Sequence, residues 1–204
     1  MTMVVYLGRI GRQKGPIRRN DVGGIASKGQ LRMSLLRWAV VVVPLILLLG
    51  FASGRSVPAG DANRWYVALA KPAATPPDWM FPVVWSLLYV MLGVALAMIL
   101  NARGARGRGL AVALFAAGFA LALAWQPLFF GAHRVGLALL VIAGMLALGI
   151  ATTLAFGRIR AAAAWLMVPY LAWVSMAGVL TWQIGRMNPD ADTLVPAAHT
   201  SQLL

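Results

Sequence analysis

The chain has 204 residues, of which 61% are hydrophobic and only 11% are charged, and its mean hydropathy is +0.79. A water-soluble domain of this length could not bury so much apolar surface, so the composition predicts a single, all-α integral membrane domain. The formal charge of +13 gathers at the ends of apolar segments, which argues against nucleic-acid binding and fits contact with lipid headgroups. The lack of cysteine excludes disulfides, thiol catalysis and cysteine-based metal sites.

The first 36 residues are polar, basic and rich in glycine, and they carry no helical or strand periodicity. We expect them to form a disordered tail. The sequence after Met33 resembles a natural N-terminus, which makes residues 1–32 either an extension or a misplaced start. The predicted organisation is therefore an N-terminal extension over residues 1–33, a membrane domain over residues 34–189 and a short C-terminal tail over residues 190–204.

Five apolar segments follow the N-terminal region. The first, residues 38–52, is short enough to resemble the apolar core of a signal peptide, but a retained helix is favoured because five helices complete a bundle. The other four are each long enough for a hydrocarbon core of about 30 Å at about 1.5 Å per residue. They span residues 82–100, 110–130, 135–156 and 161–184. The pattern predicts a bundle of five transmembrane helices.

Basic residues are unevenly shared between the two ends of this predicted bundle. The N-terminal tail and the gap at residues 101–109 hold most of them. The positive-inside rule then places the N-terminus in the cytoplasm and the C-terminus outside, as in a bacterial inner membrane. The bias depends largely on residues 1–32.

Small residues recur at helical spacing in the third apolar segment, at Ala116, Ala120 and Ala124. Such faces let helices approach closely in lipid. Packing within one bundle and a homodimer through this face both fit the pattern.

Three segments carry aromatic side chains at helical spacing beside smaller ones. If these faces point inward, they form a flat apolar slot that can stack on a planar ligand. The residues are Trp85 and Tyr89; Ala122, Trp125 and Phe129; and Trp173, Ala177 and Thr181. The alternative is that tryptophans mark the membrane interface, which is favoured for Trp38, Trp65, Trp79, Trp165 and Trp182 near segment ends.

Prolines dominate the gap between the first two segments and predict that residues 71–82 form no regular helix. A non-helical backbone beside a membrane bundle is expected to be structured, so this gap is interpreted as a lid over one end of the bundle. Lys71 and Arg64 could pair with an anionic group of a ligand, with lipid headgroups, or with Asp61 or Asp78.

Residues typical of hydrolytic or metal enzymes are not gathered in the apolar segments. None of the five acidic residues lies within one, and the two histidines, His133 and His199, fall in a turn and in the C-terminal tail. We therefore expect no metal site, no histidine-ligated haem and no required cofactor.

Three sequence blocks resemble the TspO/MBR family of tryptophan-rich sensory proteins, which is related to the mitochondrial translocator protein or peripheral-type benzodiazepine receptor. They are "WYVALAKPAATPPDWMFPVVWSLLY" at 65–89, "WQPLFFGAHRVGLAL" at 125–139 and "PYLAWVSMAGVLTWQI" at 169–184. The resemblance covers about residues 34–189. It implies a five-helix bundle, commonly dimeric, with a pocket beneath the first loop that binds porphyrins and other tetrapyrroles and, in some members, sterols or aromatic drugs.

The resemblance also implies which residues would form the ligand pocket. Carried over by position they are Tyr66, Pro76, Trp85, Tyr89, Trp125, Phe129, Trp173 and Ala177. In a porphyrin-degrading reaction proposed for the family, Trp85 and Trp173 would be the redox-active candidates. The chain departs from the family pattern at Ala122 and Thr181, where asparagine is common, and at Gln126, where serine is common. The sterol motif is not supported, because Tyr170 is not closely followed by a basic residue.

Three functions remain open from sequence. The preferred one is a membrane sensor, receptor or transporter that binds a tetrapyrrole in the aromatic pocket, with Lys71 or Arg64 meeting its carboxylates. The second is an enzyme that degrades porphyrin with light and oxygen. The third is a lipid- or sterol-binding scaffold.

Overall fold

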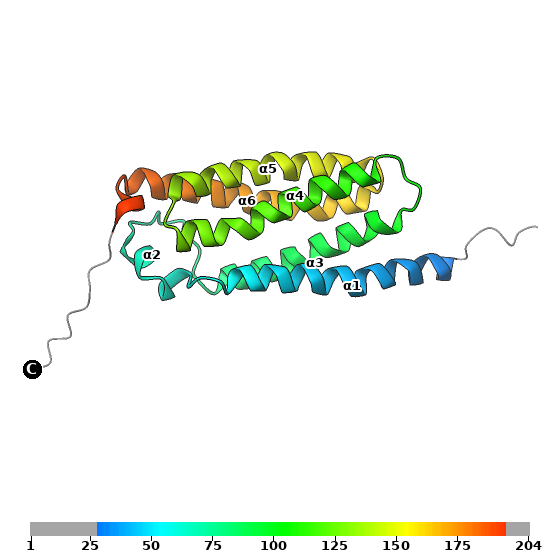
Figure 1. The fold of residues 1–204 in the computed structure, drawn as a ribbon, viewed down its shortest axis with the longest axis horizontal. Helices are drawn as coiled ribbons and strands as arrows, with labels where there is room; N and C mark the ends of the chain where they lie inside the picture. The colour runs from blue at the N-terminus through cyan, green and yellow to red at the C-terminus, as the bar shows by residue number, and fades with distance from the viewer. Residues whose placement is uncertain (1–27, 195–204) are drawn as a thin grey trace, which may run out of the picture.

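Within the part of the chain that the structure describes, five long helices lie side by side, and each is apolar and long enough to cross a membrane (Figure 1). The computed structural model describes residues 28–194, with side chains from residue 33 onward. The five helices are α1 (Lys28–Gly54), α3 (Met80–Asn101), α4 (Arg108–Gln126), α5 (Val135–Gly157) and α6 (Ala161–Met187). The predicted bundle of five membrane-spanning helices is confirmed.

Four short elements complete the described chain and lie at one end of the bundle (Figure 1). They are η2 (Gly60–Ala62), α2 (Arg64–Ala68), the π-helical turn η3 (Pro127–Gly131) and η4 (Ala191–Thr193). The connections α3–α4 and α5–α6 lie at the opposite end with the start of α1. The two ends therefore differ in architecture: one carries a folded cap, and the other carries short turns.

The first helix begins earlier than its apolar run. α1 starts at Lys28, so the expectation that residues up to 36 lack helical structure is wrong for residues 28–36. Lys, Gln, Leu, Arg and Met, which dominate this stretch, are good helix formers, and Leu35 already packs against the core. Residues 1–27, the rest of the predicted extension, lie outside the described residues.

Helices α1 and α3 approach so closely that only glycine fits at their contact. A Cβ atom placed at Gly93 would lie 2.8 Å from the Cα of Val43, which is closer than two carbon atoms can pack. Val42 and Ile46 are buried on the same side of α1, so this helix is an integral part of the bundle core.

Replacing Gly93 by alanine should destabilise the bundle by about 1–3 kcal/mol, because the added methyl group must push two backbones apart. Helix propensity alone would make alanine stabilising at this position by about 1 kcal/mol. A loss of stability on Gly93→Ala would therefore report the clash between the two helices. Gly136→Ala, where no atom lies within 4 Å of the new Cβ, is the matched control and should be neutral or slightly stabilising. Thermal unfolding in detergent, followed by circular dichroism, measures both. Equal effects would contradict the close approach.

A proline ends the regular part of α4 and couples it to α1. Pro127 has no N–H to donate to the carbonyl of Leu123, and Ser53 of α1 donates its hydroxyl to that oxygen at 2.6 Å instead. The chain then continues as the π-helical turn, in which the Ala132 N–H donates to the Pro127 carbonyl at 2.8 Å. The predicted third segment is therefore a helix with a changed last turn, and π-helical turns of this kind often accompany functional sites.

Helix α3 begins within the stretch that was expected to be non-helical. Its first residue is Met80, so the expectation for residues 71–82 is wrong at residues 80–82. Pro82 is tolerated there because a residue in the first turn has no intrahelical partner for its N–H.

Candidate functional site

The cap over one end of the bundle is a folded loop held by three polar anchors. The first is Asn63, a buried residue at the start of α2. Its side-chain oxygen accepts from the Tyr66 N–H at 3.0 Å, and its amide donates to the carbonyls of Pro58 and Phe130, each at 2.9 Å. Asn63 therefore starts α2 and ties the loop to η3, the turn that follows α4.

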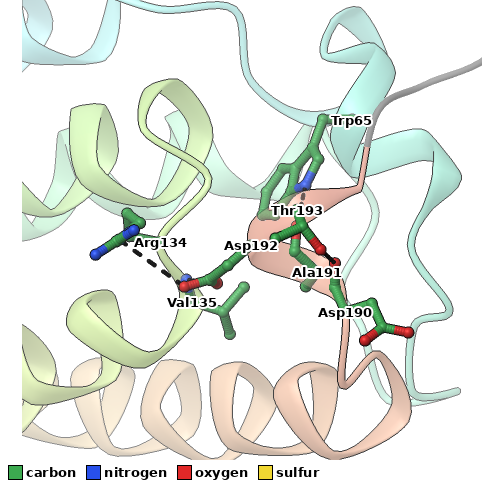
Figure 2. Close-up of polar contacts among 7 residues, drawn as sticks. All are labelled: Trp65, Arg134, Val135, Asp190, Ala191, Asp192 and Thr193. Atoms are coloured by element: carbon green, nitrogen blue, oxygen red, sulfur yellow. Dashed lines mark hydrogen bonds and ion pairs between the residues drawn. The ribbon is translucent and has the colours of Figure 1, made fainter.

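The second anchor is Trp65, whose side chain is only 1% exposed. Its indole N–H donates to the Ala191 carbonyl of η4 at 2.8 Å, as Figure 2 shows, and its ring stacks on His133 with centroids 4.5 Å apart. The interpretation of Trp65 as a membrane-interface residue is wrong. By contrast, Trp79, Trp165 and Trp182 are exposed near helix ends, as that interpretation expects.

The segment after α6 takes part in this anchor. The Asp192 carboxylate accepts from the Val135 N–H at 3.0 Å, at the first residue of α5, and lies 3.9 Å from the Arg134 guanidinium (Figure 2). A carboxylate at a helix start compensates the positive end of the helix dipole. Residues 190–194, assigned to a tail from sequence, are therefore packed onto the cap, while residues 195–204 lie outside the described residues.

The third anchor is Asn188 at the end of α6. Its amide donates to the Ala70 carbonyl and its side-chain oxygen accepts from the Ala70 N–H, both at 2.8 Å. This paired contact fixes the loop directly after α2. The interpretation of the proline-rich gap as a structured lid thus has a physical basis in three separate contacts.

Beneath the lid lies the main cavity, with a volume of about 380 Å³. Its walls come from the end of α1, the lid, the start of α3 and the end of α4, and they are mostly aromatic or apolar. The residues that define it here are Tyr66, Phe81, Trp85, Tyr89, Ala122, Trp125 and Phe130, with Arg55, Asp78 and Gln126 as polar members. Its volume lies in the range of about 300–1,000 Å³ that is typical of small-molecule sites.

A smaller cavity of about 40 Å³ adjoins the main one on the side of α6. Tyr66, Phe81, Trp125 and Phe130 line both cavities, so they form the wall between them. Phe129, Trp173, Ala177 and Thr181 line only the smaller one. The aromatic residues picked from sequence are thus divided between two adjacent spaces.

Two of the predicted ligand-binding residues, Lys71 and Pro76, line neither cavity. The Lys71 ammonium donates to the backbone carbonyls of Tyr66, Val67 and Leu69 at 2.8, 3.3 and 3.1 Å. It also lies 4.7 Å from the centre of the Tyr66 ring. The ammonium thus binds carbonyls in the last turn of α2 and at Leu69 directly after it, so its charge stabilises the lid.

Sequence reasoning did not assign the polar side chains of the main cavity to the site. Arg55 is the cationic residue there, directly after α1, and Asp78 is the anionic one. The Asp78 carboxylate accepts from the Asp61 N–H and packs against Gly60, whose φ of +60° and lack of a side chain leave room for it. Gln126 donates to the Gly54 carbonyl at 2.6 Å and holds α4 to α1.

Two groups in the cavity wall have unusual environments. Burial in the lid, together with the charges of Asp78 and Asp61, raises the pKa of the Tyr66 phenol, so this hydroxyl stays protonated and able to donate at physiological pH. The indole N–H of Trp125 is buried without a hydrogen-bond partner in the described part of the chain. Residues 28–194 gather no three His, Cys, Asp or Glu side chains that could hold a metal ion.

Comparison with known proteins agrees with the architecture. The family model described as "TspO/MBR family" matches residues 40–187. The chain is 38% identical over 148 residues to "Tryptophan-rich protein TspO" of Chlorobaculum tepidum, covering 72% of this chain and 93% of that protein. It is 37% identical to "Translocator protein" of Bos taurus, over 71% of this chain and 86% of that protein. It is 36% identical to "Tryptophan-rich sensory protein" of Cereibacter sphaeroides, over 62% of this chain and 78% of that protein.

The sequence blocks, the five-helix bundle and the match over most of the chain point the same way. The chain belongs to the TspO/MBR family and is a multi-pass integral membrane protein.

Proposed function

We propose that the main cavity binds a planar, largely apolar ligand of the tetrapyrrole class, and that the protein acts as a membrane sensor or transporter for it. The observation that carries this proposal is an aromatic-walled space of about 380 Å³ beneath an anchored lid. Trp85 and Trp125 offer indole faces for stacking, and relatives carry the names "sensory" and "translocator".

The polar groups of the cavity suggest how such a ligand would be oriented. Arg55 is exposed and lines the cavity, so it is suited to meet a carboxylate at the ligand's edge. It replaces Lys71 and Arg64 in this role, because neither lines the cavity. Asp78 would disfavour a second anionic group on its own side.

The unpartnered indole N–H of Trp125 adds a second polar requirement. A buried donor without an acceptor costs about 1–3 kcal/mol, and a ligand nitrogen or oxygen that reached it would recover that cost. Asparagine is common in the family at the position of Ala122, where this chain has no polar side chain. The Trp125 N–H would supply a hydrogen-bond donor to the ligand in its place. Trp125→Phe keeps an aromatic face but removes the donor, and should weaken binding by about five- to tenfold.

The proposal is tested by titrating protoporphyrin into the full-length protein in lipid nanodiscs and following its main absorption band. We expect saturation at one porphyrin per chain. Protein-free nanodiscs of the same lipid give the control for partition into the bilayer. A linear, unsaturated response equal to that control would contradict the proposal.

A second candidate is degradation of the bound porphyrin in light and oxygen. Trp85 lines the main cavity, and its ring lies 5.3 Å from that of Tyr89, which places two oxidisable side chains side by side at the ligand. Trp173 lies beyond this wall, in edge contact with Phe81 at 5.8 Å. Illumination of the complex in air distinguishes the functions. Loss of porphyrin absorbance that is abolished by Trp85→Phe favours an enzyme, and unchanged absorbance favours a sensor or transporter.

We also propose a bacterial inner-membrane location with the N-terminus in the cytoplasm. Within residues 33–194, six arginines lie at the end that carries the start of α1, against five basic residues at the lid end, which is the sense that the positive-inside rule requires. Reporter enzymes that are active only in the periplasm, fused to either terminus, test this orientation. Activity of the N-terminal fusion would contradict it.

We also propose that the protein forms a homodimer through the small-residue face of α4. Ala116 and Ala120 are exposed in the single chain, and Ala124 is half-buried, so the small-residue face is free for close contact with a second copy. Ala120→Leu should shift the detergent-solubilised protein toward monomer in analytical ultracentrifugation. An unchanged dimer population would place the interface elsewhere.

A further inference from the structure

A groove far from the lid opens between the first turns of α1 and the α3–α4 connection. It has a volume of about 290 Å³ and is lined by Ser34, Arg37, Trp38, Val41 and Arg103. Ser34, Trp38 and Val41 follow each other at spacings of four and three residues, so they share one face of α1. We refer to it as the Arg37–Arg103 groove.

The two guanidinium groups of this groove are free to bind an anion. Arg37 and Arg103 are exposed and form neither a side-chain hydrogen bond nor an ion pair within the described part of the chain. The backbone around Arg103 is nevertheless ordered: its N–H donates to the Asn101 carbonyl at 2.8 Å, and the Ala102 N–H donates to that of Ile99 at 3.1 Å. The position of Arg103 is therefore set by the turn that ends α3.

The charge at this end of the bundle is strongly one-sided. All aspartates within residues 33–194 lie at the opposite end, in the lid or after α6, at positions 61, 78, 190 and 192. Within residues 33–194, every charged residue at the end with the groove is an arginine. These are Arg37, Arg103, Arg106, Arg108, Arg158 and Arg160. An anion in the groove would meet two guanidinium groups, a serine hydroxyl and no neighbouring carboxylate of the described chain.

The groove also continues into an apolar surface. Val41, Leu45 and Leu48 are 63%, 52% and 69% exposed, and they form a stripe that runs from the groove along α1 toward the middle of the membrane. Half-buried Trp38 lies between the cationic and the apolar parts, where tryptophan prefers the level of the headgroups. A ligand with an anionic head and long acyl chains matches both parts, whereas a free phosphate ion would use only the first.

From this arrangement we propose that the Arg37–Arg103 groove is a binding site for one anionic phospholipid. The phosphate lies between the two guanidinium groups and the Ser34 hydroxyl, and an acyl chain lies along Val41, Leu45 and Leu48. Basic pockets at the ends of membrane helices commonly bind such headgroups. The proposal concerns a separate surface and does not depend on the ligand of the main cavity.

The test is native mass spectrometry of the full-length, delipidated protein titrated with phosphatidylglycerol or with phosphatidylcholine of identical acyl chains. The first phosphatidylglycerol should bind more tightly than the first phosphatidylcholine. The double variant Arg37→Gln/Arg103→Gln should weaken this first step by about 10- to 30-fold. The control, Arg106→Gln/Arg160→Gln, removes the same charge from the same end outside the groove and should change it less than about threefold.

Three results would overturn the proposal. Equal losses in the two double variants would show diffuse attraction in place of a site. Equal binding of the two lipids would remove the need for an anion, and displacement of phosphatidylglycerol by millimolar inorganic phosphate would indicate an ion site without a lipid. The single substitution Arg103→Gln, in an exposed turn, gives a second reading if the double variant unfolds, with an expected loss of about threefold to fivefold.

Discussion

Replacing Trp65 by alanine is expected to lower the free energy of unfolding by about 3–5 kcal/mol. The side chain is 1% exposed, contacts Phe129 at a centroid distance of 5.4 Å and stacks on His133. Truncation would leave a cavity and also remove the donor to the Ala191 carbonyl. The lid, the turn before α5 and the segment after α6 all meet at this residue, so one change loosens all three.

Reversible unfolding in detergent, followed by circular dichroism, measures this effect. Trp165→Ala is the matched control, because that tryptophan is 74% exposed and its loss should change stability by less than about 0.5 kcal/mol. Trp65→Phe keeps one aromatic ring but loses the indole donor and part of the buried volume, so we expect an intermediate loss of about 1–2 kcal/mol. Similar stability of Trp65→Ala and Trp165→Ala would show that the lid is not anchored as described.

Replacing Trp85 by alanine is expected to weaken protoporphyrin binding by about 1–3 kcal/mol, or roughly 5- to 150-fold, which is the scale of aromatic stacking on a planar ring system. Trp85 lines the main cavity beside Tyr89, so its removal takes away one face of the slot. The same titration that tests the proposed function gives the affinity, and circular dichroism checks that the bundle remains folded.

Trp173→Ala is the matched control for this second prediction. It removes the same side chain from a residue that lines only the smaller cavity, so its effect on affinity should be below about threefold. A larger loss from Trp173→Ala than from Trp85→Ala would place the ligand on the side of α6. Equal affinity in both variants and the wild type would show that the ligand stacks on neither tryptophan.

Much of the architecture could be predicted from the sequence because a membrane helix carries a strong local signal. Five apolar runs predict five helices, and helical spacing placed Trp85, Tyr89 and Trp125 on one cavity. Helix ends were less predictable. α1 begins at Lys28 and α3 at Met80, because backbone hydrogen bonding continues through polar residues and tolerates Pro82 in a first turn.

The structure of the cap cannot be predicted from local sequence patterns, because its contacts join distant parts of the chain. Trp65 meets Ala191 and Asn63 meets Phe130, and no spacing rule relates these positions. Lys71 shows the same limit. Its charge suggests a ligand contact, yet its ammonium donates to three backbone carbonyls in and directly after α2. Asn63 was the exception, because asparagine before a short helix is a common N-cap and could have been recognised.

The most direct test of the central claim is a protoporphyrin titration of the variant Ala122→Phe. Ala122 is buried in the wall of the main cavity, so a phenyl ring there occupies the space assigned to the ligand. We predict at least a tenfold loss of affinity, equivalent to about 1.4 kcal/mol, while Ala172→Phe on the exposed surface of α6 binds as the wild type does. Wild-type affinity and stoichiometry in a folded Ala122→Phe variant would contradict the account, because the ligand would then lie outside the main cavity.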